Sequence, residues 1–311
     1  MPLDPHAKRL LDMLAMTSSV DALCLNVNDR RDLFRKLMSL SESNVPIGSI
    51  ENRVLPGPGG PINVRLYTPI ATLADQVPGL VYFHGGGLVA GSLDTHDSLC
   101  RTLANETGCR LISVDYRLAP EHKFPAAVMD SYTAAVWAVE HATELAVDRD
   151  RIAVAGDSAG ATLAAIVCQL ARRARRVHFA AQLLLCPITD FVAEAASRSD
   201  FAKGYLLDKA IMDRDREHYL PVGTDPTDPR ISPLRASELS GLPAACIHTA
   251  EFDPVRDEGR AYAYRLACAG VRVNYTCHAG MIHLFYGMAN TIPYARTALK
   301  QIGSELRAAL G

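Results

Sequence analysis

Short apolar runs alternate with amphipathic segments from residue 80 to the C-terminus. The runs suit buried strands, and in the segments between them apolar positions recur at spacings of three and four, as on one face of a helix. We predict strands at residues 80–83, 111–114, 152–155, 181–186, 244–249 and 271–276. We predict helices at residues 97–107, 126–141, 161–173, 255–269 and 292–310. This alternation is typical of an α/β protein, in which a mostly parallel central sheet is covered by helices on both faces.

The segment before residue 80 has a different pattern. Val54 and residues 62–67 belong to two alternating runs that flank Pro56-Gly57-Pro58-Gly59-Gly60, a stretch whose proline and glycine content is typical of a turn. Because no helix separates the two runs, we predict an antiparallel hairpin here.

Two further segments have no place in the predicted sheet. Residues 6–45 have a helical pattern, and residues 191–239 interrupt the alternation with a polar helix at 208–218 and a Pro/Asp-rich loop at 221–233. Ligands of open α/β sheets bind at the carboxyl ends of the strands. We expect both segments to cover those ends, with some of the apolar positions Leu10, Leu14, Leu33 and Leu37 packed over the active site.

Composition places the chain among ordinary globular proteins. Of 311 residues, 49% are hydrophobic and 21% are charged, and 32 Lys and Arg against 34 Asp and Glu give a net charge of −2. This balance argues against nucleic acid or an anionic membrane as a partner. Since there is no charged start followed by an apolar segment, and no apolar run of about 18 residues, we expect a cytoplasmic protein without membrane contact.

The eight cysteines do not indicate a disulfide framework. Most of them, including Cys168, Cys186, Cys246 and Cys268, lie within apolar strand or helix runs, as small buried hydrophobic residues do. We therefore predict reduced cysteines. Cysteine and histidine also show no metal-ligand spacing, so we predict neither a metal nor another cofactor.

The sequence Gly156-Asp157-Ser158-Ala159-Gly160 lies between a predicted strand and a predicted helix. A serine in a sharp turn between a strand and a helix has its hydroxyl lifted clear of the sheet, and the flanking glycines avoid collisions that side chains would cause. The free N–H groups and the positive dipole end of the helix favour an oxyanion at this point. We interpret Ser158 as a nucleophile.

A serine nucleophile needs a histidine base and an acid that fixes the histidine tautomer. In a strand–turn–helix serine site the chain order is nucleophile, acid, histidine, each on a loop after a later strand. Asp253 follows the strand 244–249 and is the predicted acid, with Glu251 and Asp257 as alternatives.

His283 follows the strand 271–276 and is the predicted base. The alternatives are His278, in the same predicted loop, and His248, which lies within a predicted strand and suits a core position better.

The stretch His84-Gly85-Gly86-Gly87 ends the first predicted parallel strand. Successive glycines let the backbone approach a ligand and turn N–H groups toward it, so this loop is one half of a predicted oxyanion hole and the N–H of Ala159 is the other. A phosphate-binding loop is the alternative, but the glycine spacing is wrong and no Lys-Ser/Thr follows.

Taken together, these motifs resemble the hormone-sensitive-lipase family of α/β-hydrolases, which are mostly bacterial carboxylesterases. The resemblance rests on His84–Gly87, Gly156–Gly160, Asp115-Tyr116-Arg117-Leu118-Ala119-Pro120-Glu121 and Asp253-Pro254-Val255-Arg256-Asp257-Glu258. It implies an α/β-hydrolase fold with the triad Ser158, Asp253 and His283 and an oxyanion hole at Gly85, Gly86 and Ala159. It also implies a helical cap built from residues 1–45 and an insertion near 195–225, on a catalytic domain spanning 46–311.

The sequence departs from the family pattern at Leu88, Ala161 and Leu284, where the family often has an aromatic residue, a glycine and a glycine. We expect Leu88 and Leu284, together with Asp157 beside the serine, to line the substrate pocket. These positions affect substrate preference and leave the chemistry unchanged.

The motifs predict a serine carboxylester hydrolase that acts on small-molecule esters with short to medium acyl chains through an acyl-enzyme, as a monomer or homodimer. A hydrolase of amides or lactones is the alternative among enzymes, since the same triad serves those substrates. A small-molecule binding protein is the alternative from another class, and the presence of His283 argues against it.

Overall fold

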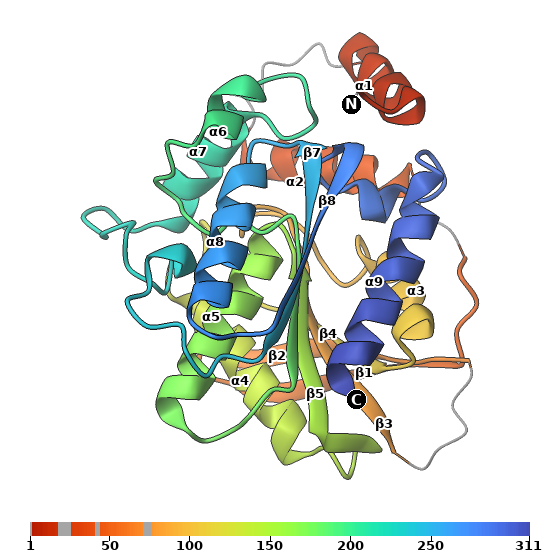
Figure 1. The fold of residues 1–311 in the computed structure, drawn as a ribbon, viewed down its shortest axis with the longest axis vertical. Helices are drawn as coiled ribbons and strands as arrows, with labels where there is room; N and C mark the ends of the chain where they lie inside the picture. The colour runs from red at the N-terminus through yellow and green to blue at the C-terminus, as the bar shows by residue number, and fades with distance from the viewer. Residues whose placement is uncertain (1, 18–25, 41–43, 71–75) are drawn as a thin grey trace.

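Eight strands form one sheet in the computed structural model, which describes residues 2–17, 26–40, 44–70 and 76–311 (Figure 1). The strands are β1 (Ser49–Gly57), β2 (Gly60–Thr68), β3 (Val77–Phe83), β4 (Arg110–Asp115), β5 (Val147–Asp157), β6 (Ala181–Leu185), β7 (Ala244–Phe252) and β8 (Val273–Ile282). They lie in the order β1-β2-β4-β3-β5-β6-β7-β8.

The pairing directions follow the two sequence patterns. The hairpin β1–β2 is antiparallel and β2 pairs antiparallel to β4, whereas every pair from β4–β3 to β7–β8 is parallel. The predicted mostly parallel sheet and the predicted hairpin are therefore confirmed.

Helices cover both faces of the sheet. On one face α4 (Ala126–Glu140) packs against α5 (Ala159–Ala174), with α8 (Arg256–Cys268) beside β7, and on the other α3 (Asp97–Thr107) packs against α9 (Tyr294–Leu310) (Figure 1). Central strands are apolar on both faces because each face meets a helix; Val81, Val154 and Leu184 are fully buried. The predicted α/β fold with two helical layers is confirmed.

The remaining helices lie outside these layers. They are α1 (Pro5–Thr17), α2 (Val27–Ser39), α6 (Ala196–Asp200), α7 (Lys209–Tyr219) and the 3₁₀ turns η2 (Pro233–Arg235) and η3 (Phe285–Met288). The helix α7 agrees with the predicted polar helix, whereas η3 was not predicted. Of the segment predicted to be helical, residues 18–25 and 41–43 lie outside the described residues.

The helix α1 packs beside the edge strand β8. The Asp4 N–H donates to the Gly280 carbonyl at 3.0 Å, and Leu10 is buried in the main core, with Leu14 packed against it. The expectation that some of these apolar positions pack over the active site holds for Leu33 and Leu37 of α2, which line the pocket. It does not hold for Leu10 and Leu14, because α1 packs at the edge of the sheet.

Two positions differ from the sequence prediction. The strand β8 continues to Ile282, so His278 lies within the strand and not in the loop after it. Cys268, predicted to be buried, is exposed near the end of α8. Among the described residues, all seven cysteines are free thiols, as predicted.

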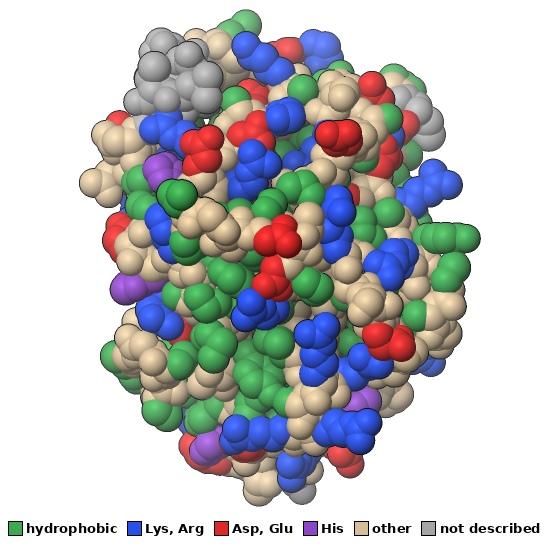
Figure 2. Space-filling view, turned by 90° about the vertical axis from the view of Figure 1, so that its left-hand side faces the viewer, with side chains coloured by type: hydrophobic (Ala, Val, Ile, Leu, Met, Phe, Trp, Pro, Cys, Tyr) green, Lys and Arg blue, Asp and Glu red, His purple; other side chains and the backbone are tan. Residues whose placement is uncertain are grey.

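The surface on the side of α6 and α7 carries charges of both signs. Figure 2 shows Lys and Arg side chains interspersed with Asp and Glu and with hydrophobic side chains over this face. Within the described ranges, no helix combines the length and the apolar character needed to cross a bilayer.

Candidate active site

Ser158 occupies a strained turn between β5 and α5. Its φ of 53° and ψ of −121° lie outside the regions that L-residues prefer. A Cβ on Gly156 would overlap the backbone of Gly160, and a Cβ on Gly160 would overlap the Phe83 carbonyl. The turn closes because both positions are glycine, and the Ser158 N–H is held by the Leu185 carbonyl of β6 at 2.8 Å.

Three side chains from different strand ends meet at this turn. His283 Nε2 lies 2.9 Å from Ser158 Oγ, and His283 Nδ1 lies 2.8 Å from Asp253 Oδ2. Asp253 directly follows β7 and His283 directly follows β8, so the parallel sheet brings its carboxyl ends to one edge. All three side chains are at most 5% exposed. A second oxygen of Asp253, Oδ1, accepts the Val255 N–H at 3.0 Å.

The alternative acids are engaged elsewhere. Asp257 accepts hydrogen bonds from Arg256 and from the Ser197 N–H. Glu251 accepts the Gly280 N–H at 2.7 Å.

The alternative histidines form a pair of their own. His248 Nδ1 lies 3.2 Å from His278 Nε2, and His278 Nδ1 lies 3.1 Å from the Tyr294 hydroxyl. The structure therefore brings Ser158, Asp253 and His283 together and keeps His248 and His278 apart from the serine.

The glycine loop contributes different N–H groups from those predicted. The Gly85 N–H donates to Asp157 Oδ1 at 2.8 Å, so Gly85 cannot serve a substrate oxyanion and that part of the prediction is wrong. Among the described residues, the N–H groups of Gly86, Gly87 and Ala159 have no acceptor, and all three residues line the pocket around Ser158. Ala159 is also the first residue of α5, whose positive dipole end therefore faces the same point.

Asp157 lies beneath the pocket and not on its wall, so its prediction as a pocket residue is wrong. It is fully buried and accepts hydrogen bonds from Tyr82 and Gly85. Burial acts to raise the pKa of Asp157, but buried His96, 3.4 Å away, and the Tyr82 hydroxyl together outweigh it and lower that pKa. The carboxylate fixes the shape of the glycine loop.

The two leucines that depart from the family pattern have different positions. Leu88 is 1% exposed and lies in the core with a φ of 65°, so it does not line the pocket and its prediction is wrong. Leu284 lines the pocket, as expected from its place next to His283.

The pocket above Ser158 is walled by segments far apart in the sequence. From α2 come Leu33, Phe34 and Leu37, and from α7 come Ile211 and Met212. Leu206 and Leu207 precede α7, and Ile188 and Phe191 follow β6. The described parts of the two segments that the sequence places over the strand ends therefore meet at this pocket.

Comparisons with known proteins agree with the fold and motifs. A family model described as an α/β-hydrolase fold matches residues 80–287. The chain belongs to the hormone-sensitive-lipase family of α/β-hydrolases.

Relatives of this α/β-hydrolase include named esterases. It is 45% identical to the carboxylic ester hydrolase LipN of Mycobacterium tuberculosis over 82% of this chain and 69% of the relative. It is 37% identical to an arylesterase of Saccharolobus solfataricus over 99% of both chains. A solved ester hydrolase from the Lake Arreo metagenome, in complex with a bipyridine phosphonate derivative, has a TM-score of 0.95 and 41% identity over 98% of both chains.

In this α/β-hydrolase, α2 is held in place by two consecutive arginines. Arg30 pairs with Asp215 of α7 at 3.0 Å. Arg31 Nε donates to the Val89 carbonyl at 2.9 Å, and its guanidinium also binds Glu121. These contacts were not predicted, because polar residues on an amphipathic helix are expected to face water and nothing in the sequence indicates their partners.

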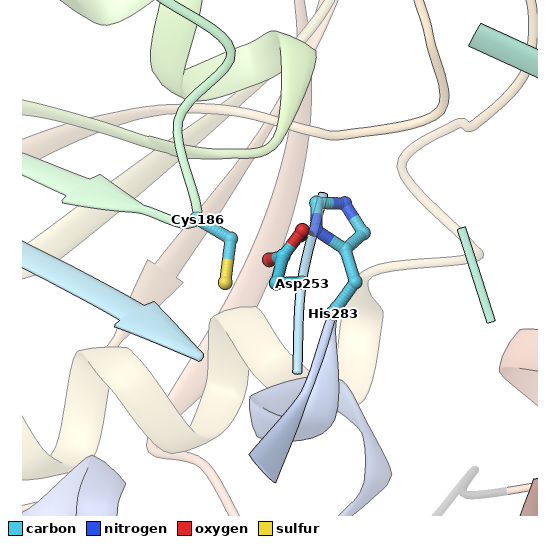
Figure 3. A group of neighbouring side chains, drawn as sticks. All are labelled: Cys186, Asp253 and His283. Atoms are coloured by element: carbon cyan, nitrogen blue, oxygen red, sulfur yellow. Dashed lines mark hydrogen bonds and ion pairs between the residues drawn. The ribbon is translucent and has the colours of Figure 1, made fainter. Parts of the chain in front are cut away.

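One neighbour of Asp253 and His283 was also missed. Figure 3 shows the side chains of Cys186, Asp253 and His283 next to one another. Cys186 Sγ, a carboxylate oxygen of Asp253 and a ring nitrogen of His283 lie within 4.8 Å of one another. Two ligand atoms bound to one tetrahedral zinc ion lie about 3.3 Å apart. Asp253 Oδ2 and His283 Nδ1 are closer than this, because a direct hydrogen bond of 2.8 Å joins them. The cluster therefore fits hydrogen bonding and not a metal, and the sequence indicated only a small buried hydrophobic residue at position 186.

Proposed function

We propose that this α/β-hydrolase is a serine carboxylester hydrolase that acts through an acyl-enzyme. The observation that carries the proposal is the continuous chain of contacts from Ser158 Oγ through His283 to Asp253, at 2.9 and 2.8 Å. This chain opens into a pocket at Ser158. The esterase names of the relatives support the same class of substrate.

In the first half of the reaction, neutral His283 takes the Ser158 proton while Oγ attacks the ester carbonyl carbon. Asp253 accepts a hydrogen bond from the Nδ1–H of His283, which orients Nε2 toward the serine and stabilises the imidazolium. The imidazolium then protonates the leaving alcohol, and the acyl group remains on Ser158.

In the second half, His283 takes a proton from water, and the resulting hydroxide attacks the acyl carbon. The carboxylic acid leaves as Oγ regains its proton from His283. In both halves the carbonyl oxygen becomes negative, and we assign its stabilisation to the N–H groups of Gly86, Gly87 and Ala159, since they have no other acceptor among the described residues.

We further propose that the substrate carries a short to medium acyl chain. The pocket is walled by apolar side chains such as Phe34, Leu37 and Ile211, which favour a hydrocarbon group. Of the expected cap, built from residues 1–45 and an insertion near 195–225 on the catalytic domain 46–311, we assign α2 and the insertion with α7 to the cover of the pocket, because both contribute to this wall.

Hydrolysis of p-nitrophenyl acetate by the purified full-length chain tests the proposal, with Ser158→Ala as the matched inactive variant. A fluorophosphonate should add one phosphonyl group to Ser158, as detected by peptide mass. An amide and a lactone of the same acyl size should be hydrolysed more slowly than the ester. Absence of ester hydrolysis and of labelling would contradict an enzyme function, and faster hydrolysis of the amide or lactone would change the substrate class.

A further inference from the structure

Cys186 places a fully buried thiol beside Asp253. The residue follows the last residue of β6, and Figure 3 shows the Asp253 carboxylate lying between the Cys186 sulfur and the His283 ring. Its φ of 42° is in the left-handed region, which is unfavourable for a residue with a side chain. Such conformations persist where the surrounding structure fixes them, often next to a functional site.

Cys186 has one hydrogen-bond donor to its sulfur and one carboxylate nearby. The Tyr286 hydroxyl donates to Sγ, and the Cys186 N–H donates to the His248 carbonyl at 2.7 Å. Burial, followed by the negative charge of Asp253, raises the pKa of the Cys186 thiol well above its usual range. The proton therefore stays on sulfur, and the nearby charged acceptor is the Asp253 carboxylate.

A buried carboxylate needs several donors to remain ionised. Asp253 receives one from His283 Nδ1 and one from the Val255 N–H. A thiol is a weak donor, so an S–H directed at this carboxylate would satisfy a further lone pair while leaving most of the charge available to His283.

We propose that Cys186 is a positioning residue for the triad acid: its S–H donates to the Asp253 carboxylate, and the Tyr286 hydroxyl orients the sulfur. This inference rests on the proposed triad. The residues Tyr286, Cys186, Asp253, His283 and Ser158 then form one line of contacts, which joins η3, β6 and the ends of β7 and β8.

The strength of the donor at position 186 should determine how strongly Asp253 holds the His283 proton. Cys186→Ser introduces a stronger donor, which withdraws charge from the carboxylate, so the acidic limb of kcat/KM should move to lower pH. Cys186→Ala removes the donor, so the limb should move to higher pH. We expect opposite displacements of about 0.3 pH unit or more, with kcat of Cys186→Ala reduced about 3- to 10-fold at unchanged KM.

Tyr286→Phe should act in the same direction as Cys186→Ala, but less, because it weakens the orientation of the sulfur and leaves the thiol in place. Cys168→Ser and Cys168→Ala are the matched controls, because Cys168 is a buried thiol in α5 whose raised pKa has burial as its cause. Neither control should move the limb.

The experiment is a pH profile of p-nitrophenyl acetate hydrolysis for all five variants, with urea unfolding to verify that each is folded. If Cys186→Ala does not fold, Cys186→Ser and Tyr286→Phe form the opposed pair. The positioning role would be overturned if the acidic limb moved in the same direction in Cys186→Ser and Cys186→Ala, or if it moved in neither variant. Ser158→Ala is measured in parallel, and wild-type activity in that variant would instead refute the proposed function.

Discussion

Arg30 of α2 and Asp215 of α7 form an ion pair of 3.0 Å between two helices that wall the pocket. Their side chains are only 15% and 8% exposed, and Asp215 lies so close to Gly87 that a Cβ there would overlap its carboxylate. The pair therefore connects the two helices directly above the glycine loop. Because the pair is largely shielded from solvent, removing one charge leaves the other without compensation.

Arg30→Met should destabilise the protein more at pH 8 than at pH 5. Burial raises the pKa of Asp215 to about 6, and Arg30 is the main group that opposes this. At pH 8 the variant contains a buried carboxylate without its cation, whereas at pH 5 the carboxyl is mostly protonated with or without Arg30. We expect the free energy of unfolding to fall by about 3 kcal/mol at pH 8 and by less than about 1 kcal/mol at pH 5 in urea titrations.

The matched control is Arg30→Met in an Asp215→Asn background. In this background Arg30→Met should lower the free energy of unfolding by the same amount at pH 5 and pH 8, because the asparagine at position 215 cannot ionise. Equal losses at pH 5 and pH 8 with Asp215 present would show that Arg30 acts by packing over Phe34, which lies 5.5 Å from its guanidinium, and not by charge.

Ser158 and His283 should behave as one unit in kinetics. Ser158→Ala and His283→Ala are each expected to lower kcat for p-nitrophenyl butyrate on the order of 10⁴-fold, and the double variant should lose little more, because neither residue works without the other. Asp253→Asn should also be severe. Asp257→Asn should be mild, since Asp257 is engaged with Arg256 and Ser197. Multiplying losses in the double variant, or the reverse order of the two Asn variants, would reassign the triad.

The turn at Ser158 should not tolerate a methyl group at Gly160. A Cβ there would overlap the carbonyl groups of Phe83, the last residue of β3, and His84, which follows it, and these cannot move without disturbing the glycine loop. We expect Gly160→Ala to cost about 3 kcal/mol or more of unfolding free energy and most of the activity. Gly287→Ala is the control, because its Cβ would meet only the flexible end of Met38. A Gly160→Ala protein with wild-type melting temperature and rate would contradict this account of the turn.

The sequence predicted the elements and the meeting of Ser158, Asp253 and His283 because both depend on local patterns. The runs that became β3, β5 and β6 are apolar on both faces, and Asp253 and His283 follow strands in a parallel sheet, which places them at one edge. The strand β8 was predicted too short at its C-terminal end because residues 277–280 are Cys, His, Ala and Gly, which do not form an apolar or alternating run, although the backbone pairing with β7 continues to Ile282.

Features that depend on contacts between distant segments could not be predicted. The three glycines are identical in the sequence, so it does not indicate which of their N–H groups is free. The Gly85 N–H is not free because it donates to the carboxylate of Asp157, 72 residues later in the chain. The Arg30–Asp215 pair joins positions 185 residues apart, each on the polar face of a helix. The role of Cys186 depends on the positions of Tyr286 and Asp253 around it, and nothing in the sequence beside it indicates those neighbours.

His248 should make the protein less stable in acid. Burial, followed by the nearby His278, lowers the pKa of His248 to about 3, against about 6.5 in an unfolded chain. The unfolded state therefore binds a proton that the folded state does not, so the free energy of unfolding falls as the pH falls from about 6.5 toward 3. At pH 5 this loss of unfolding free energy is about 2 kcal/mol.

His248→Gln removes this proton uptake. Relative to wild type, its free energy of unfolding should improve by about 2 kcal/mol between pH 7 and pH 5 in urea titrations. His122→Gln, an exchange at an exposed histidine, is measured in parallel as the control. A difference between His248→Gln and wild type that is the same at both pH values would show that His248 is not held neutral.

Leu37 and Leu10 should separate the effect of the pocket wall from that of the core. Leu37 of α2 lines the pocket, whereas Leu10 of α1 is 3% exposed in the main core. For wild type, each added methylene should raise kcat/KM by up to about 4-fold while it is buried, equivalent to about 0.8 kcal/mol. The gain should stop when the pocket is full, within roughly two to eight acyl carbons.

Leu37→Ala removes three side-chain carbons from the pocket wall, so the acyl chain length with the highest kcat/KM should become about two or three carbons longer. Leu10→Ala should cost about 2–3 kcal/mol of stability and leave the optimum unchanged. A series of p-nitrophenyl esters measures both; equal optima in the two variants, or a wild-type preference for emulsified long-chain triglyceride, would show that α2 does not limit the acyl chain.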